Sequence, residues 1–181
     1  MSVADPSIRS NVERTFFKLL SELPESQQRL VEARANPKHY ESARDAPLLG
    51  WTPLGYAVGL RDAVRKVVGD DEQFVRLMKE WSLLSITRPP FKVLGEAILR
   101  IYDRAPGSLL RAYERVWNTI YRHVSSYGVE REHDGHALVV MEQACEDAQS
   151  HTFRLYNLGV LSAVAEIGGA TEVHGTHRVS G

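Results

Sequence analysis

The chain has 181 residues, of which 43% are hydrophobic and 25% are charged, a composition typical of one ordinary globular domain. Its formal net charge of −1 provides no positive field for nucleic acid, and its one cysteine, Cys145, excludes an internal disulfide and a four-cysteine zinc site. The sequence has no signal-peptide pattern and no apolar run near the ~20 residues that a membrane span needs, so we expect a cytoplasmic protein without such a span.

The first two thirds of the chain predict a series of helices separated by proline or glycine. Apolar residues recur at the spacing of the buried face of an amphipathic helix. Gly69 ends one of these helices, and Ser108 is placed to cap another. The segment 38–49 is less regular and is expected to be a connector with one helical turn. The expected helices cover residues 5–23, 25–35, 52–68, 70–86, 91–102 and 108–124.

The last third of the chain predicts two strands, a helix and a further strand. Two extended runs meet at Asp134 and Gly135, which favour the positive φ angles of a two-residue hairpin turn. The run 137–141 is continuously apolar, as in a strand that is covered on both faces. The segment 151–167 is apolar nearly all round, which predicts a central helix. The last strand is expected over residues 171–179.

Together these elements predict an α+β fold in a single domain, residues 1–181. An N-terminal bundle of five or six helices, within residues 1–125, is expected to pack on a small C-terminal antiparallel sheet. Residues 126–181 supply the hairpin, the helix and the strand of the C-terminal part. The sequence contains no repeat of fixed period, no low-complexity tract and no linker that would divide the chain.

Seven histidines raise the question of a metal site. A two-residue turn would place His133 and His136 directly opposite each other, with their Cβ atoms ~5 Å apart. A structural zinc needs four protein ligands and a catalytic zinc needs three, and the neighbours Glu132 and Asp134 do not complete such a set. Solvated histidines at the tip of a hairpin are the simpler interpretation, so a metal cofactor is not supported. His123 lies near the end of an expected helix that is rich in aromatic residues, but its interaction with the helix dipole is a simpler explanation than haem binding, so a haem cofactor is not supported either.

The sequence contains no group of residues that is typical of an enzyme. Cys145 lies beside Glu146 and Asp147, and negative neighbours disfavour the reactive thiolate. No Gly-x-Ser-x-Gly nucleophile motif is present. The pair Gly168-Gly169 follows a helix rather than a strand, unlike a phosphate-binding loop. We therefore expect a protein without catalytic residues.

Several short motifs resemble a family of uncharacterised proteins that is described mainly from myxobacteria. These motifs are Trp51-Thr52-Pro53, Gly69-Asp70-Asp71, Ala105-Pro106-Gly107-Ser108-Leu109-Leu110, Trp117 and Tyr127-Gly128. The segment 157–173 is similar to the vinyl-reductase-type small-molecule-binding domain. That domain is related in fold to haem–nitric-oxide sensor domains and to trafficking-particle subunits.

The resemblance implies a non-enzymatic sensor or scaffold. Such folds enclose an apolar pocket between helices and sheet, and they often form dimers. Members of the vinyl-reductase type often carry metal-binding cysteines beside the last helix and strand, where this chain has Thr152, Phe153, His177 and Arg178. The tyrosine–serine–arginine signature of haem sensors is also not visible. Neither a metal role nor a haem role is therefore carried over to this chain.

From these observations we expect a sensory or regulatory domain that binds a small apolar ligand between helices and sheet. For each candidate pocket residue, the simpler alternative is that it fills the core. A second hypothesis is a protein–protein interaction module that acts as a homodimeric scaffold without a ligand. The candidate pocket residues are Trp81, Trp117, Tyr121, Leu138, Val140, Tyr156 and Val160.

Overall fold

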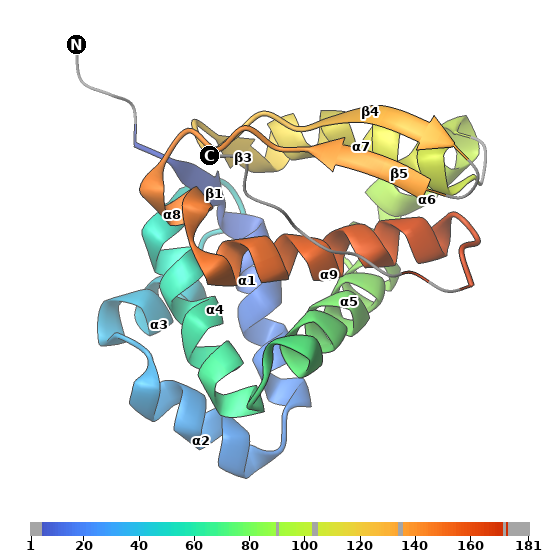
Figure 1. Cartoon of the computed structure of the whole chain (residues 1–181). Helices are drawn as coiled ribbons and strands as arrows, with labels where there is room; N and C mark the ends of the chain where they lie inside the picture. The colour runs from blue at the N-terminus through green and yellow to red at the C-terminus, as the bar shows by residue number, and fades with distance from the viewer. Residues whose placement is uncertain (1–4, 90, 103–104, 134–135, 172, 174–181) are drawn as a thin grey trace.

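The protein is mainly helical and carries small antiparallel sheets, which confirms the α+β class (Figure 1). The computed structural model describes residues 5–89, 91–102, 105–133, 136–171 and 173. No helix within these residues combines the length and the hydrophobicity that crossing a membrane requires. The helices are α1 (Ser10–Leu19), the 3-10 turn η1 (Leu20–Glu22), α2 (Glu25–Arg34), α3 (Pro37–Arg44), α4 (Leu54–Val68), α5 (Asp71–Thr87), α6 (Phe91–Ile101), α7 (Pro106–Ile120), α8 (Glu146–Gln149) and α9 (His151–Ile167). The strands are β1 (Ser7–Arg9), β2 (Trp51–Pro53), β3 (Tyr121–Arg122), β4 (Gly128–His133) and β5 (His136–Val140).

A three-stranded antiparallel sheet joins three segments that lie far apart in the sequence. β1 is its middle strand, and Ile8 pairs with Thr52 of β2 and with Tyr121 of β3. The predicted helix start at residue 5 is therefore wrong, because residues 7–9 are extended and α1 follows them. Strands from distant parts of the chain satisfy the backbone hydrogen bonds of these residues, and local periodicity does not reveal such partners.

Two helix starts differ from the prediction for local reasons. The segment that was expected as a connector contains α3. Its first turn is stabilised by Asn36, whose side chain accepts a hydrogen bond from the Lys38 amide (3.0 Å), and by Pro37 at the first helical position. Helix α7 begins at Pro106 rather than behind a Ser108 cap, since proline is well suited to a first helical turn.

The hairpin of β4 and β5 has the predicted register. His133 pairs with His136, although the turn residues 134–135 lie outside the described part of the chain. The pairing shifts between Val129 and Arg131, where one strand has an extra residue. Such a bulge increases the local twist of a hairpin and lets it follow a curved surface.

One face of the hairpin packs on the helical part of the molecule. Val129 and Val139 contact the buried cluster around Trp117 of α7. The hairpin lies alongside α7 (Figure 1). Leu138 is 48% exposed, so the expectation of a strand that is covered on both faces is wrong for the single chain. The last predicted strand, residues 171–179, falls almost entirely outside the described residues.

Helix α9 runs through the middle of the molecule, as its apolar sequence predicts (Figure 1). Its main neighbours are α5 and α7. It passes α5 closely at Gly159, where an added methyl group would lie 2.6 Å from Met78 Cβ and 2.7 Å from the Val75 carbonyl oxygen. Helix α7 contacts both α9 and strand β4 of the hairpin.

Within the described part of the chain, most of the buried apolar side chains belong to two clusters. The first lies among α1, α4 and α5 and includes Phe74 and Met78. The second lies beneath β1, α4 and α7 and surrounds Trp117. Helix α9 contributes Leu155 to the first cluster and Phe153 to the second, so it connects the two parts of the core.

Candidate functional site

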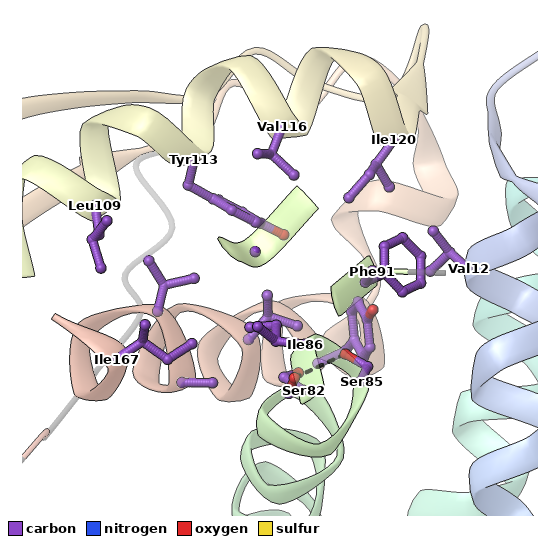
Figure 2. A pocket seen from close by; sticks show the side chains of 15 residues that line it. Val12, Ser82, Ser85, Ile86, Phe91, Leu109, Tyr113, Val116, Ile120 and Ile167 are labelled. Carbon is purple, nitrogen blue, oxygen red and sulfur yellow. Dashed lines mark hydrogen bonds between the residues drawn. The ribbon is translucent and has the colours of Figure 1, made fainter. Parts of the chain in front are cut away.

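An apolar cavity of about 160 Å³ lies between α5, α6, α7 and α9, beside α1. Figure 2 shows side chains of α7 pointing toward α9 across this space. Each helix contributes residues three or four apart, which therefore share one helical face. Helix α7 contributes Leu109, Tyr113, Val116 and Ile120, and helix α9 contributes Tyr156, Val160, Ala163, Val164 and Ile167.

The remaining walls of the cavity come from the other helices. Phe91 and Gly95 of α6 line it, as do Val12 of α1 and Ile86 of α5. Gly95 lies so close to α5 that an added methyl group would be 2.6 Å from Ile86 Cγ2. The absence of a side chain at residue 95 therefore lets α6 approach α5 and complete the cavity wall.

Four residues that line the cavity carry hydroxyl groups. Ser82 donates a hydrogen bond to the Met78 carbonyl oxygen (2.7 Å), and Ser85 donates to the Ser82 carbonyl oxygen (2.8 Å), so both serines are engaged within α5 (Figure 2). The hydroxyls of Tyr113 and Tyr156 form no hydrogen bond with any described residue. Figure 2 shows the Tyr113 ring reaching from α7 into the cavity.

A buried ion pair lies behind Tyr156. The Arg61 guanidinium is 2.7 Å from the Glu13 carboxylate, and both side chains are 1% exposed. The guanidinium stacks between the rings of Phe16 and Tyr156, 4.3 Å from each ring centroid. It also donates a hydrogen bond to the Ala57 carbonyl oxygen (2.9 Å). Since the two charges compensate each other, this wall of the cavity carries no net charge.

Tyr113 and Tyr121 stay protonated. Burial raises the pKa of Tyr113 well above its usual value, and the nearby hydroxyl of Tyr156 raises it further. Burial likewise raises the pKa of Tyr121, with a further contribution from Tyr156. The Tyr113 hydroxyl therefore offers its proton to an acceptor at any physiological pH.

The structure brings together only part of the predicted pocket. Tyr156 and Val160 line the cavity. The other candidate residues do not line it, because the cavity lies among helices rather than between helices and sheet. Trp81 is buried in the first core cluster, Trp117 and Tyr121 are buried in the second, Leu138 is exposed on the hairpin, and Val140 is half-buried there.

Sequence reasoning missed the contributions of both α6 and α7. The spacing of residues 109, 113, 116 and 120 gives α7 a pronounced apolar stripe, and this stripe was the available signal. Nothing in the sequence indicates that Phe91 and Gly95 face the same space, because this depends on how α6 folds back on α5.

The sequence also raised His133, His136 and Cys145 as candidates for a metal or thiol site. Among the described residues, no group of three or more histidine, cysteine, aspartate or glutamate side chains is placed to hold a metal ion. His133 and His136 are described only by their strand pairing. Cys145 is half-buried and immediately precedes α8.

Comparison with models of known protein families, with curated proteins and with solved structures found no match for this chain. The resemblance to vinyl-reductase-type domains therefore stays a prediction from the sequence.

Proposed function

We propose that the protein is a non-enzymatic sensory or regulatory domain that binds a small apolar molecule in the cavity between α5, α6, α7 and α9. The observation that carries this proposal is the lining, which is apolar except for four hydroxyl-bearing side chains. An enclosed apolar cavity of about 150 Å³ takes up benzene or xenon, which sets the scale of the ligand. A cavity of about 160 Å³ suits a ligand of similar size, smaller than the ligands of sites of roughly 300–1,000 Å³.

Helix α6 is the part of the wall through which binding would be sensed. Phe91 and Gly95 line the cavity, whereas Val93 and Ile101 on the same helix are 76% and 74% exposed. The main neighbour of α6 is α5, so fewer elements hold it than hold α9. A ligand that contacts Phe91 shifts the equilibrium between different positions of α6 toward the position to which it binds more tightly.

Filling the cavity tests this proposal. Val164→Phe places a larger side chain in the space between α7 and α9, and Leu48→Phe makes a comparable change at an exposed loop position as a control. Native mass spectrometry of protein purified from cells detects a retained ligand, and ¹H–¹⁵N NMR titration with α-methylstyrene measures binding directly. We expect binding by the wild type and by Leu48→Phe, and its loss in Val164→Phe. The absence of both a retained ligand and any shift in the wild type would contradict the proposal.

A second candidate function is a homodimeric scaffold, which is favoured by the outer face of α6. Val93, Ala97 and Ile101 recur every four residues along this face and are exposed, with Glu96 and Arg100 along one edge. In an antiparallel helix pair related by a twofold axis, the same edges of the two helices meet. Glu96 of each copy would then lie opposite Arg100 of the other. The domains that the C-terminal sequence resembles often form dimers.

Reversal of these charges tests the dimer. Glu96→Arg places like charges on both copies, whereas the combined Glu96→Arg and Arg100→Glu exchange restores opposite charges. Sedimentation should show a wild-type dimer, a weakened single variant and a recovered double variant. A wild-type monomer at concentrations of about 100 μM would count against a stable interface, which buries at least ~1,000 Å².

A further inference from the structure

The two tyrosine hydroxyls of the cavity are the unexplained feature of its otherwise apolar lining. The Ser82 and Ser85 hydroxyls donate to backbone carbonyl oxygens of α5, which leaves Tyr113 and Tyr156 as the lining residues with hydroxyls unengaged by any described residue. Their rings come from two helices, α7 and α9, that line the same cavity. A hydroxyl that a bound ligand encloses costs free energy unless the ligand gives it a hydrogen-bond partner, so a ligand that supplies one is favoured.

The charge balance of the site determines which kind of ligand suits it. The Arg61 guanidinium lies 4.3 Å from the ring centroid of Tyr156, but its charge is compensated by Glu13 at 2.7 Å. A ligand carboxylate would therefore enter an apolar space without an uncompensated cation and would lose its hydration. A neutral acceptor still receives hydrogen bonds from the tyrosine hydroxyls, and it avoids the cost of removing a charged group from water.

We propose that the cavity selects compact neutral molecules that carry one carbonyl oxygen, and that this oxygen accepts hydrogen bonds from the hydroxyls of Tyr113 and Tyr156. This inference rests on the proposed ligand-binding function and specifies the chemical class of the ligand. A carbonyl oxygen has two lone pairs and accepts two such bonds, while the apolar body of the molecule contacts residues such as Val160 and Ile167.

Three probes of matched size test the proposal. Acetophenone carries the carbonyl group, α-methylstyrene replaces its oxygen by a methylene group, and benzoate replaces its methyl group by a charged oxygen. Dissociation constants are measured by ¹H–¹⁵N NMR titration of the wild type and of Tyr113→Phe and Tyr156→Phe. Both variants keep the aromatic ring, and the amide spectrum of each reports whether it is folded.

Acetophenone is expected to bind the wild type about fivefold to tenfold more tightly than α-methylstyrene, and benzoate more weakly than either. Tyr113→Phe should remove most of the advantage of acetophenone and leave the affinity for α-methylstyrene unchanged. Tyr156→Phe should act in the same direction, so one folded variant is sufficient for the comparison.

The outcomes separate this inference from the function on which it rests. Equal affinity for acetophenone and α-methylstyrene, or tightest binding of benzoate, would overturn the carbonyl preference and leave the apolar cavity as a binding site. An advantage of acetophenone that persists in both tyrosine variants would also overturn it. If none of the probes bound the wild type, the inference and the proposed function would fail together.

Discussion

At the scale of single residues, the Glu13–Arg61 pair is the least ordinary feature of the core. Both side chains are buried, and Arg61 stacks between the rings of Phe16 and Tyr156. Neither oxygen of Glu13 accepts a well-directed hydrogen bond from a described residue, although the charges lie 2.7 Å apart. A buried pair of this kind contributes little net stability, but removal of one partner leaves an uncompensated charge in the core.

This argument predicts the result of a double-mutant cycle. Glu13→Leu and Arg61→Met should each reduce the free energy of unfolding by about 3–5 kcal/mol, because each leaves the other charge buried alone. The double variant should be more stable than either single variant, since no charge then remains in the core. Urea denaturation of the four proteins measures the coupling free energy. Additive losses would show that the two groups do not interact as the geometry indicates.

A second residue-scale prediction concerns His39 and pH. His39 stacks on Tyr56, with ring centroids 4.9 Å apart, and burial lowers its pKa, while the charge of Asp147 opposes this in part. Because the folded state binds this proton less readily than the unfolded state, stability should fall as the pH decreases through about 6.5. The Asp71 carboxyl titrates below this pH range, because the hydrogen bond from His151 and, after it, the one from Arg65 lower its pKa.

His39→Phe should therefore reduce the loss of stability between about pH 8 and about pH 5. His123→Asn is the matched control, because His123 is exposed and its positive φ of 56° is tolerated by asparagine. The free energy of unfolding is measured by urea denaturation across this range. An unchanged pH dependence in His39→Phe, or an equal change in the control, would show that His39 is not responsible.

At the scale of elements, the close crossing of α9 and α5 depends on Gly159. An alanine methyl group there would meet backbone atoms of α5, which cannot move aside as a flexible side chain can. We expect Gly159→Ala to destabilise the protein by about 1–3 kcal/mol, even though alanine has the higher helix propensity. Gly128→Ala is the control, because nothing lies within 4 Å of a methyl group at that position. Thermal unfolding of both variants checks this, and a stabilised Gly159→Ala would contradict the close crossing.

Hydrophobic periodicity predicted most of the helices, because each buries one face and this face repeats along the sequence. The spans of α2, α4, α5 and α9 agree with the prediction within two residues. The sheet of β1, β2 and β3 escaped prediction, since each strand has at most three residues and its partners lie far along the chain. The hairpin register was predicted because two neighbouring runs and their turn define it locally.

The candidate site was harder to predict for a related reason. Its lining is drawn from five helices, and apolar residues that face a cavity have the same spacing as those that fill a core. Among the predicted pocket residues, Tyr156 and Val160 line the cavity, whereas Trp117 belongs to the core. Which apolar face borders empty space depends on the volumes of side chains from all neighbouring helices.

At the scale of the whole molecule, the two ends of the described chain support each other. β1 pairs with β3, which directly follows α7, and α9 packs against α4, α5 and α7. Phe153 and Leu155 of α9 are 2% and 5% exposed and belong to different core clusters. Residues 1–125, which the sequence marks as the mainly helical part, would therefore expose parts of both clusters if they were separated from α9.

We expect a fragment of residues 1–125 to lack a cooperative unfolding transition, because the surface left by α9 is apolar and its burial contributes a large share of the stability. A chain that ends at residue 173 keeps α9 and all described contacts of that helix, and it should unfold in one sharp transition near that of the full chain. Circular dichroism and urea denaturation compare the two fragments, and dye binding reports exposed apolar surface. A fragment 1–125 with a sharp transition and a dispersed NMR spectrum would instead show that the helical part forms its own domain and that α9 only docks on it.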